Sequence, residues 1–233
     1  MTKTKLFCFP YAGGSSFVYE KWRPLLKPEI ELVPVELAGR GRRIYDTLYT
    51  DITSVIDDVF EMLKDDIYNG PYALLGHSMG SLITYELAQR LMDIGAPDPQ
   101  HLFFSGKGAP NIKRADEKQY HAMADDEFRR EIVSLGGTPK EFFEEPELME
   151  LFLPILKNDF KIVETYPRRS EIRPFHYDIT VFMGKADDHT HEQRVGWNDY
   201  TAAKCNIHYF EGGHFFIHDE TDAMVSIINQ TIK

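Results

Sequence analysis

Apolar and polar positions follow two different periods along most of the chain. Residues 72–77 (YALLGH) form a nearly continuous apolar run, which is typical of a strand buried on both faces of a sheet. Residues 50–67 instead repeat apolar side chains at helical spacing, so that one stripe is apolar and the remainder polar. These two patterns predict strands at residues 5–10, 30–37, 72–77, 101–106, 177–184 and 205–212.

Helices are predicted between most of these strands. Gly95 and Pro97 end the helix that begins near residue 79, and Pro34 marks its strand as an edge strand or a bent one. Strands that alternate with helices indicate an α/β fold, with a mainly parallel sheet and helices on both faces, in one domain over residues 1–233. The predicted helices span residues 16–26, 50–67, 79–93, 191–203 and 221–233.

The alternation stops between about residues 107 and 173. This stretch mixes charged and apolar residues at helical spacing, and it has no clear strand pattern. We expect a helical insertion there, acting as a lid above the carboxyl ends of the strands, where open α/β sheets bind ligands. The alternative is that the insertion only enlarges the core.

Charge and composition narrow the classes of function. The formal net charge of -11 argues against sequence-independent nucleic-acid binding, and an acidic partner would need a local basic patch. No apolar run approaches the roughly 18 residues of a membrane helix, and the N-terminus lacks a signal-peptide pattern, so a cytoplasmic protein with no membrane partner is expected. Cys8 and Cys205 lie in strand-like runs and are expected to be buried free thiols.

A serine between two glycines separates a predicted strand from a predicted helix. A serine hydroxyl becomes a good nucleophile only when a base takes its proton and backbone amides stabilise the oxyanion. Gly76 and Gly80 permit a sharp turn that exposes Ser78, and the Met79 amide then points at the developing charge. We predict that Ser78 is a nucleophile and that Met79 is an oxyanion donor; the alternative is an ordinary turn serine.

Nine histidines are candidates for the base. His214 follows the last predicted strand in FEGGHFFI, where Gly212 and Gly213 free the loop to carry it over the sheet. His214 is therefore the predicted base, and His218 is the second choice. His77 is expected to be a packing residue beside the serine. Four others have no motif around them and are expected to pack or to lie on the surface: His101, His121, His176 and His208.

An acid is needed to orient the histidine and to stabilise its protonated form. In an α/β-hydrolase it falls between the serine and the histidine in chain order. Asp187 and Asp188 both follow the strand that ends in VFMG, and the spacing favours Asp187 over Asp188. The adjacent His189 and His191 suggest a metal site, but no partner cysteine or third ligand is evident beside them, so no metal is expected.

A second oxyanion donor is expected in the loop after the first strand. In FCFPYAGGSS the chain turns at Pro10 and exposes the amides of Tyr11 and Ala12 before two glycines. Tyr11 is the first choice and Ala12 the second. The alternative is a plain turn from strand to helix.

Several motifs follow one another along the chain: CFPYAGGSS, ELAGRGRR, LLGHSMGSLITYELA, SLGGTP, LFLPILKNDFKIVETY, VFMGKADD and FEGGHFFI. Together they resemble the type II thioesterases of non-ribosomal peptide and polyketide synthesis, over about residues 5–230. The resemblance implies a stand-alone α/β-hydrolase that cleaves acyl groups from the phosphopantetheine arm of a carrier protein. Such an enzyme removes misprimed or stalled acyl groups. Ala38 stands where related sequences often have proline.

The resemblance also gives roles to an arginine-rich loop and to the insertion. Arg40, Arg42 and Arg43 are candidates for the basic patch that a carrier needs; the alternative is a solvated loop. Apolar residues of the insertion are candidates for the wall of an acyl site, although such spacing is more often ordinary packing. These are Phe142, Phe143, Leu148, Met149, Leu151, Phe152 and Leu153.

Other functions stay open at this point. The same fold and triad suit a medium-chain fatty acyl-carrier thioesterase or a general carboxylesterase. A terminal thioesterase cut from a larger synthetase is a further alternative, although a chain that starts at Met1 and ends at a closing helix favours a stand-alone protein. A non-catalytic binding module is disfavoured, because all three triad residue types occur in order. No organic cofactor is expected, and the protein is expected to act as a monomer.

Overall fold

A six-stranded parallel sheet forms the centre of the molecule. The computed structural model describes residues 2–113, 118–136, 145–169 and 171–233. The strand order is β2-β1-β3-β4-β5-β6, and every neighbouring pair is parallel, which confirms the predicted fold class. The strands are β1 (Thr4–Phe9), β2 (Ile30–Pro34), β3 (Tyr72–His77), β4 (Leu102–Ser105), β5 (Ile179–Gly184) and β6 (Cys205–Phe210).

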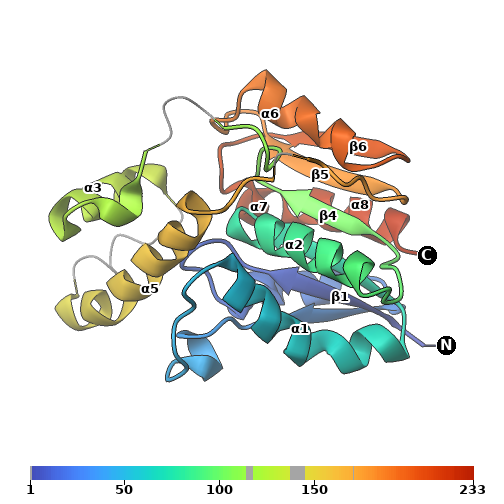
Figure 1. Cartoon of the computed structure of the whole chain (residues 1–233), viewed down its shortest axis with the longest axis horizontal. Helices are drawn as coiled ribbons and strands as arrows, with labels where there is room; N and C mark the ends of the chain where they lie inside the picture. Colours follow the sequence, from blue (N-terminus) through green and yellow to red (C-terminus); the bar gives the residue numbers. More distant parts are fainter. Residues whose placement is uncertain (1, 114–117, 137–144, 170) are drawn as a thin grey trace.

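Helices cover both faces of this sheet. They are η1 (Ser16–Leu25), η2 (Gly41–Arg43), α1 (Ile52–Asn69), α2 (Met79–Asp93), α6 (His191–Val195), η4 (Gly196–Tyr200), α7 (Phe216–Asp219) and α8 (Thr221–Thr231). Side chains of successive strand residues alternate between two apolar cores. Phe7 and Phe9 pack with α1 and α2 in one core, whereas Leu6 and Cys8 pack with η1 and α8 in the other. Figure 1 shows the sheet between these two layers.

The sequence patterns predicted the strands more closely than two of the helices. Pro34 is the last residue of β2, which is an edge strand, as expected. The short helix expected at 16–26 is a 3-10 helix over residues 16–25 that contains Pro24. The helix expected at 191–203 divides at Gly196, where a Cβ atom would lie 2.5 Å from Ile112 Cδ1. The chain continues from α6 directly into the 3-10 helix η4, and the close approach of Ile112 favours glycine at position 196.

The helical insertion lies between β4 and β5. Its described elements are η3 (Tyr120–Ala122), α3 (Asp125–Leu135) and α5 (Pro146–Glu164). In Figure 1, α3 and α5 lie beyond the carboxyl ends of the strands, on the side opposite both chain termini. The insertion has an apolar cluster of its own, formed by Phe128, Ile132, Met149, Leu153 and Leu156. It therefore does more than extend the cores of the sheet, and its action as a lid stays a prediction.

Both cysteines are free thiols, as predicted. Cys8 is fully buried, whereas Cys205 is half-buried. Burial raises the pKa of both thiols, that of Cys205 to about 11, so neither is a ready nucleophile. Among the described helices, none has the length and apolar character needed to cross a bilayer.

Candidate active site

Ser78 stands at a strained turn between β3 and α2. Its φ of 54° and ψ of -111° make it the one non-glycine residue with positive φ in the described part of the chain. Such a conformation costs about 1–3 kcal/mol and persists only where the surrounding structure enforces it. The Ser78 amide donates to the Ser105 carbonyl at 2.8 Å, and the Ser78 carbonyl accepts from the Ser81 amide at 3.0 Å. These bonds hold the turn that was predicted from the glycine-serine-glycine motif.

The two glycines of the motif let α2 pack directly on the sheet. A Cβ atom at Gly76 would lie 1.9 Å from the Gly80 carbonyl oxygen. A Cβ atom at Gly80 would lie 2.1 Å from the carbonyl oxygen of Phe9 in β1. Because both obstacles are backbone atoms, no side chain can be accommodated at either position. The motif is thus a packing requirement as well as a means of exposing Ser78.

His214 and Asp187 are joined by a hydrogen bond at the ends of neighbouring strands. Asp187 follows β5, and His214 follows β6 after Gly212, which has a φ of 91°. His214 Nδ1 donates to Asp187 Oδ2 at 3.0 Å, which leaves Nε2 available for a serine proton. Asp188, the second choice for the acid, instead donates its amide to Asp187 Oδ1 at 2.9 Å. The structure thus brings Asp187, not Asp188, to His214.

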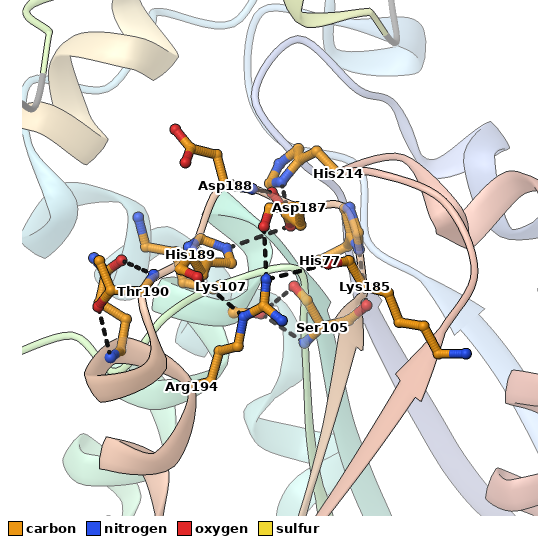
Figure 2. A network of polar contacts seen from close by, with 12 residues as sticks. His77, Ser105, Lys107, Lys185, Asp187, Asp188, His189, Thr190, Arg194 and His214 are labelled. Carbon is orange, nitrogen blue, oxygen red and sulfur yellow. Dashed lines mark hydrogen bonds and ion pairs between the residues drawn. The ribbon is translucent and has the colours of Figure 1, made fainter.

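A second imidazole, which the sequence analysis did not assign to this site, also faces Asp187. His189 Nε2 lies 3.4 Å from Asp187 Oδ2, and Figure 2 shows His189 and His214 both directed at this carboxylate. Burial would raise the pKa of the Asp187 carboxyl, but hydrogen bonds and charge from His189 and His214 hold it well below its usual range. Asp187 therefore stays ionised at any pH at which the protein is expected to work.

Arg194 fixes the loop that carries Asp187. Its Nη2 donates to the Asp187 carbonyl at 2.7 Å, and its Nε donates to the His189 carbonyl at 3.0 Å. The His189 amide in turn donates to the Asp187 carbonyl at 2.9 Å. Figure 2 shows Arg194 beneath this loop. The carboxylate is thus held by backbone bonds as well as by the two imidazoles.

The other two histidines near Ser78 have different partners. His77 is fully buried and hydrogen-bonds through Nδ1 to Ser105 Oγ at 2.8 Å. Burial, followed by the charge of His214, holds the pKa of His77 well below its usual range, which confirms it as a neutral packing residue. His218 Nε2 hydrogen-bonds to the Tyr11 hydroxyl at 3.1 Å. Neither imidazole faces Asp187, so neither has the partner that a catalytic base needs.

One cavity of about 480 Å³ brings the candidate residues together. Ser78, Asp187 and His214 all line it, as do Tyr11 and Ala12. In the described chain, no side chain accepts a hydrogen bond from Ser78 Oγ, as is common for an empty catalytic site. The apolar part of the cavity wall comes largely from the insertion, through Ile132, Leu135, Leu156, Phe160 and Val163.

The residues of α5 that were candidates for an acyl wall do not line the cavity, and ordinary packing, the favoured alternative, holds for two of them. Met149 and Leu153 are buried in the apolar cluster of the insertion, and Leu148 and Leu151 are exposed. These four residues do not line the catalytic cavity, and neither does Phe152. The apolar stripe of α5 was recognised. Its first turns pack within the apolar cluster of the insertion, and the residues that line the cavity come later in the helix. Phe142 and Phe143 lie outside the described residues.

The backbone amides predicted as oxyanion donors are available. Within the described chain, the amides of Tyr11, Ala12 and Met79 donate no hydrogen bond to another group. Met79 opens α2, where the first amides have no partner inside the helix. Tyr11 and Ala12 line the same cavity as Ser78. All three amides are thus free to donate, and their role as oxyanion donors, like the choice between Tyr11 and Ala12, stays a prediction.

A buried ion pair ties the loop after β1 to α5. Arg40 and Asp159 form two hydrogen bonds, of 2.7 and 2.8 Å, with side chains 6% and 1% exposed. Asp159 Oδ2 also accepts from the Gly13 amide at 2.8 Å, and Arg40 donates to the Gly14 carbonyl at 3.1 Å. The ion pair therefore joins the insertion to the loop that carries Tyr11 and Ala12.

The basic patch expected from Arg40, Arg42 and Arg43 is wrong for two of its three members. Arg40 is buried in the pair with Asp159. Arg43 is bonded to Asp58 and Asp46, both at 2.7 Å, and its pKa is raised chiefly by Asp58. Two of these closely spaced arginines are thus used inside the fold, and of the three only Arg42 is exposed.

Three residues at the site have the geometry of a metal cluster. Ligand atoms of Asp187, His189 and His214 lie within 4.8 Å of one another, the one such group among the described residues. The expectation that His189 lacks further ligands nearby is therefore wrong. A metal bound there would take Nδ1 of His214 away from Asp187, so this grouping is chemically at odds with a triad.

Comparisons with known proteins agree with the site. A family model described as "Thioesterase domain" matches residues 4–232. Gramicidin S biosynthesis protein GrsT of Aneurinibacillus migulanus is 34% identical, covering 99% of this chain and 90% of its own. The medium-chain S-acyl fatty acid synthase thioesterase of Rattus norvegicus is 32% identical, covering 91% of this chain and 81% of its own.

One similar protein has a name of a different kind. Linear gramicidin dehydrogenase LgrE of Brevibacillus parabrevis is 37% identical, covering 98% of this chain and 87% of its own. In the present chain, β1 is followed by Pro-Tyr-Ala-Gly-Gly rather than by the Gly-x-Gly-x-x-Gly sequence of dinucleotide-binding folds. A dehydrogenase activity is therefore not carried over to it.

Solved structures match over the whole fold. ClbQ from the colibactin NRPS/PKS pathway superimposes with a TM-score of 0.92 at 36% identity, covering 99% of this chain and 97% of its own. RedJ, a thioesterase of prodiginine biosynthesis in Streptomyces coelicolor, superimposes with a TM-score of 0.90 at 32% identity, covering 99% and 91%.

Proposed function

The chain belongs to the thioesterase family, and from this premise we propose that it is a type II thioesterase that frees carrier proteins of misprimed or stalled acyl groups. It is a thioester hydrolase related to enzymes of non-ribosomal peptide and polyketide pathways. The observation that supports its chemistry best is the hydrogen bond from His214 to Asp187 in the cavity that Ser78 lines. This arrangement suits acyl transfer to a serine and then to water.

In the proposed mechanism, Ser78 attacks the thioester carbonyl while His214 Nε2 takes the serine proton. Asp187 holds the imidazole by its Nδ1 proton and stabilises the imidazolium that forms. The amides of Met79 and Tyr11, or of Ala12 in place of Tyr11, donate to the oxyanion. His214 then protonates the departing thiolate of phosphopantetheine, which leaves an acyl group on Ser78. Water attacks this ester with His214 as base and releases the acid.

The site is proposed to need neither an organic cofactor nor a metal. Ser78, His214 and Asp187 supply the nucleophile, the base and the orienting acid within one chain, so a monomer has a complete triad. Dialysis against EDTA should leave hydrolysis unchanged. A loss of activity that Zn²⁺ restores would contradict this point and would assign Asp187, His189 and His214 to a metal instead.

Acyl release from a loaded carrier tests the proposed substrate. Acetyl-loaded carrier protein, acetyl-coenzyme A and a free activated acetyl ester would be compared for the wild type and for Ser78→Ala. The proposal predicts fastest release from the carrier and a loss of at least about a thousandfold in Ser78→Ala. Equal or faster turnover of the free ester would instead indicate a general esterase.

A second candidate is a fatty acyl-carrier thioesterase that ends chain growth. The likeness to the rat medium-chain enzyme favours it, as does the largely apolar wall that the insertion gives the cavity. Carriers loaded with acetyl, hexanoyl and decanoyl groups separate the two candidates. An editing enzyme should prefer the short acyl groups, whereas a chain-ending enzyme should prefer decanoyl.

A further inference from the structure

A buried imidazole nitrogen beside the triad has no part in the proposed mechanism. His189 Nε2 is buried and, as Figure 2 shows, directed at Asp187 together with His214. Asp187 Oδ2 lies 3.4 Å from it, beyond the roughly 2.7–3.2 Å of a well-formed N–H···O bond. Among the described residues, no group offers this nitrogen a better hydrogen bond. Because buried polar atoms usually have good partners, a nitrogen left in this state calls for an explanation.

The spacing of three ligand atoms at this point suits a tetrahedral zinc ion. Zn²⁺ binds nitrogen and oxygen at about 2.0–2.1 Å, so any two of its ligand atoms are about 3.3 Å apart in a tetrahedron. Asp187 Oδ2 lies 3.0 Å from His214 Nδ1 and 3.4 Å from His189 Nε2. Ligand atoms of the three residues all lie within 4.8 Å of one another. A small shift of the two imidazoles therefore completes the third edge of the tetrahedron.

The donor set and its surroundings favour zinc over the hard divalent cations. Two imidazoles and one carboxylate are a set that binds zinc in enzymes, whereas Mg²⁺ and Ca²⁺ take oxygen ligands. Asp187 and His214 line the catalytic cavity, so water from this cavity can fill the fourth position. Arg194 braces the loop that carries the other ligand, because it donates to the carbonyls of both Asp187 and His189. Two of the three ligands thus lie on a loop that is already fixed.

We propose that Asp187, His189 and His214 form a binding site for Zn²⁺ and that the bound ion stops hydrolysis. The inhibition rests on the proposed function, whereas the binding does not. Zn²⁺ displaces the Nδ1 proton of His214 to solvent and takes its place. The neutral imidazole then keeps its remaining proton on Nε2, the nitrogen that has to accept the proton of Ser78. Zinc binding and the serine mechanism therefore exclude each other.

Titration calorimetry with Zn²⁺ tests the binding without relying on turnover. The wild type and the inactive Ser78→Ala should bind Zn²⁺ with equal affinity, since Ser78 offers no ligand to this site. His189→Gln and Asp187→Asn each remove one ligand and should weaken binding at least about tenfold. His191→Gln is the matched control, because His191 is an exposed histidine of the same segment that does not belong to the cluster. It should bind Zn²⁺ as the wild type does.

Inhibition by Zn²⁺ tests the consequence. The substrate is a free activated acetyl ester, because its turnover releases no thiol that would bind the metal. Zn²⁺ should lower kcat rather than raise KM, so that EDTA relieves the inhibition and saturating substrate does not. Mg²⁺ should not inhibit. Each variant is compared with its own metal-free rate, and His189→Gln should need at least about ten times more Zn²⁺ for half inhibition.

The outcomes separate this inference from the proposed function. If the wild type binds no Zn²⁺, or if His189→Gln and His191→Gln respond alike, the zinc site is wrong while thioester hydrolysis stands. If Cys205→Ser abolishes the inhibition, the metal acts at that half-buried thiol, and the inference is overturned. If Zn²⁺ binds through His189 but no thioester is cleaved in a Ser78-dependent manner, the proposed function and the inhibition fail while the metal site stands.

Discussion

At the scale of single residues, Ser78 combines backbone strain with the position of a nucleophile. Its positive φ is sterically unfavourable for any residue with a Cβ atom, and the fold enforces it through bonds to Ser105 and Ser81. Stability is thus given up at the point where Ser78 lines the cavity. The glycine-serine-glycine motif predicted this turn, because only a few residue patterns permit it.

Replacing Ser78 should separate strain from chemistry. Ser78→Gly removes the Cβ atom and with it the strain, whereas Ser78→Ala keeps both. The free energy of unfolding of Ser78→Gly should therefore be about 1 kcal/mol larger than that of Ser78→Ala. Both variants should be inactive. Denaturant unfolding of the two proteins measures the difference. Equal stabilities would show that the turn stores no strain from the side chain.

His101 gives the stability a dependence on pH. It is 5% exposed, hydrogen-bonds to Thr180 Oγ1 at 2.8 Å, and burial lowers its pKa from 6.5 to about 4. Between these two values the unfolded chain binds more protons than the folded one, so stability rises with pH in this window and is lost as the pH falls below about 6.5.

The variant His101→Gln tests this linkage. As the pH falls from 6.5 to 4, the unfolding free energy of the wild type should decrease more steeply than that of the variant. The difference in slope should reach up to about 1.4 kcal/mol per pH unit. His77 has a lowered pKa too, but it is present in both proteins and cancels in the difference. Unfolding curves at several pH values provide the comparison. Parallel pH profiles for the two proteins would rule out His101 as their cause.

Sequence patterns predicted that Ser78, Asp187 and His214 lie at one site, but they did not predict the side chains around these three residues. Chain order and strand ends indicated Ser78, Asp187 and His214, because each follows a strand in a parallel sheet. His189 was missed as a partner of Asp187, since its position depends on how the loop folds back through Arg194. No periodic pattern records such a local turn.

At the scale of elements, the pair of Arg40 and Asp159 connects three segments that are distant in sequence. It joins the loop after β2, the loop after β1 and α5. A Cβ atom at Gly13, where φ is 75°, would lie 2.5 Å from Leu156 Cδ1, so the loop and the helix also touch directly. Movement of α5 would therefore be transmitted to the loop that carries the predicted oxyanion donors.

Breaking this buried pair should be costly. Asp159→Ala leaves the Arg40 charge without a partner in the interior and should lower the unfolding free energy by about 3–5 kcal/mol. The matched control is Asp66→Ala, which removes a partly exposed partner of Lys5 and should cost less than about 1 kcal/mol. Thermal and denaturant unfolding measure both. A loss in Asp159→Ala no larger than that of the control would contradict the coupling.

The elements themselves were largely predictable, with exceptions that have physical causes. The four inner strands are almost entirely buried and stand out in the sequence as apolar runs, and the two edge strands, β2 and β6, were found as well. The change from α-helix to 3-10 helix at Gly196 left no trace in the apolar pattern, and the approach of Ile112, which leaves no room for a side chain there, comes from another part of the chain. In α5 the apolar stripe was evident, but whether a given turn faces the cavity or the insertion's own cluster is set by tertiary packing.

At the scale of the whole molecule, the distribution of charge matters more than its sum. The net charge of -11 indicated that an acidic partner needs a basic patch, and the closely spaced arginines 40, 42 and 43 were candidates for it in the sequence. The fold instead uses two of them in ion pairs, Arg40 with the buried Asp159 and Arg43 with the half-buried Asp58. Which of these charges stays exposed is therefore decided by the tertiary structure.

The central claim is that Ser78 carries the acyl group between carrier and water. The most direct test mixes the wild-type protein with acetyl-loaded carrier, quenches with acid at short times, and measures intact and peptide masses. The account predicts one added acetyl group on the peptide that contains Ser78, and no adduct in Ser78→Ala or in His214→Ala. Acetate release at the wild-type rate from Ser78→Ala, or an adduct on another residue, would contradict it.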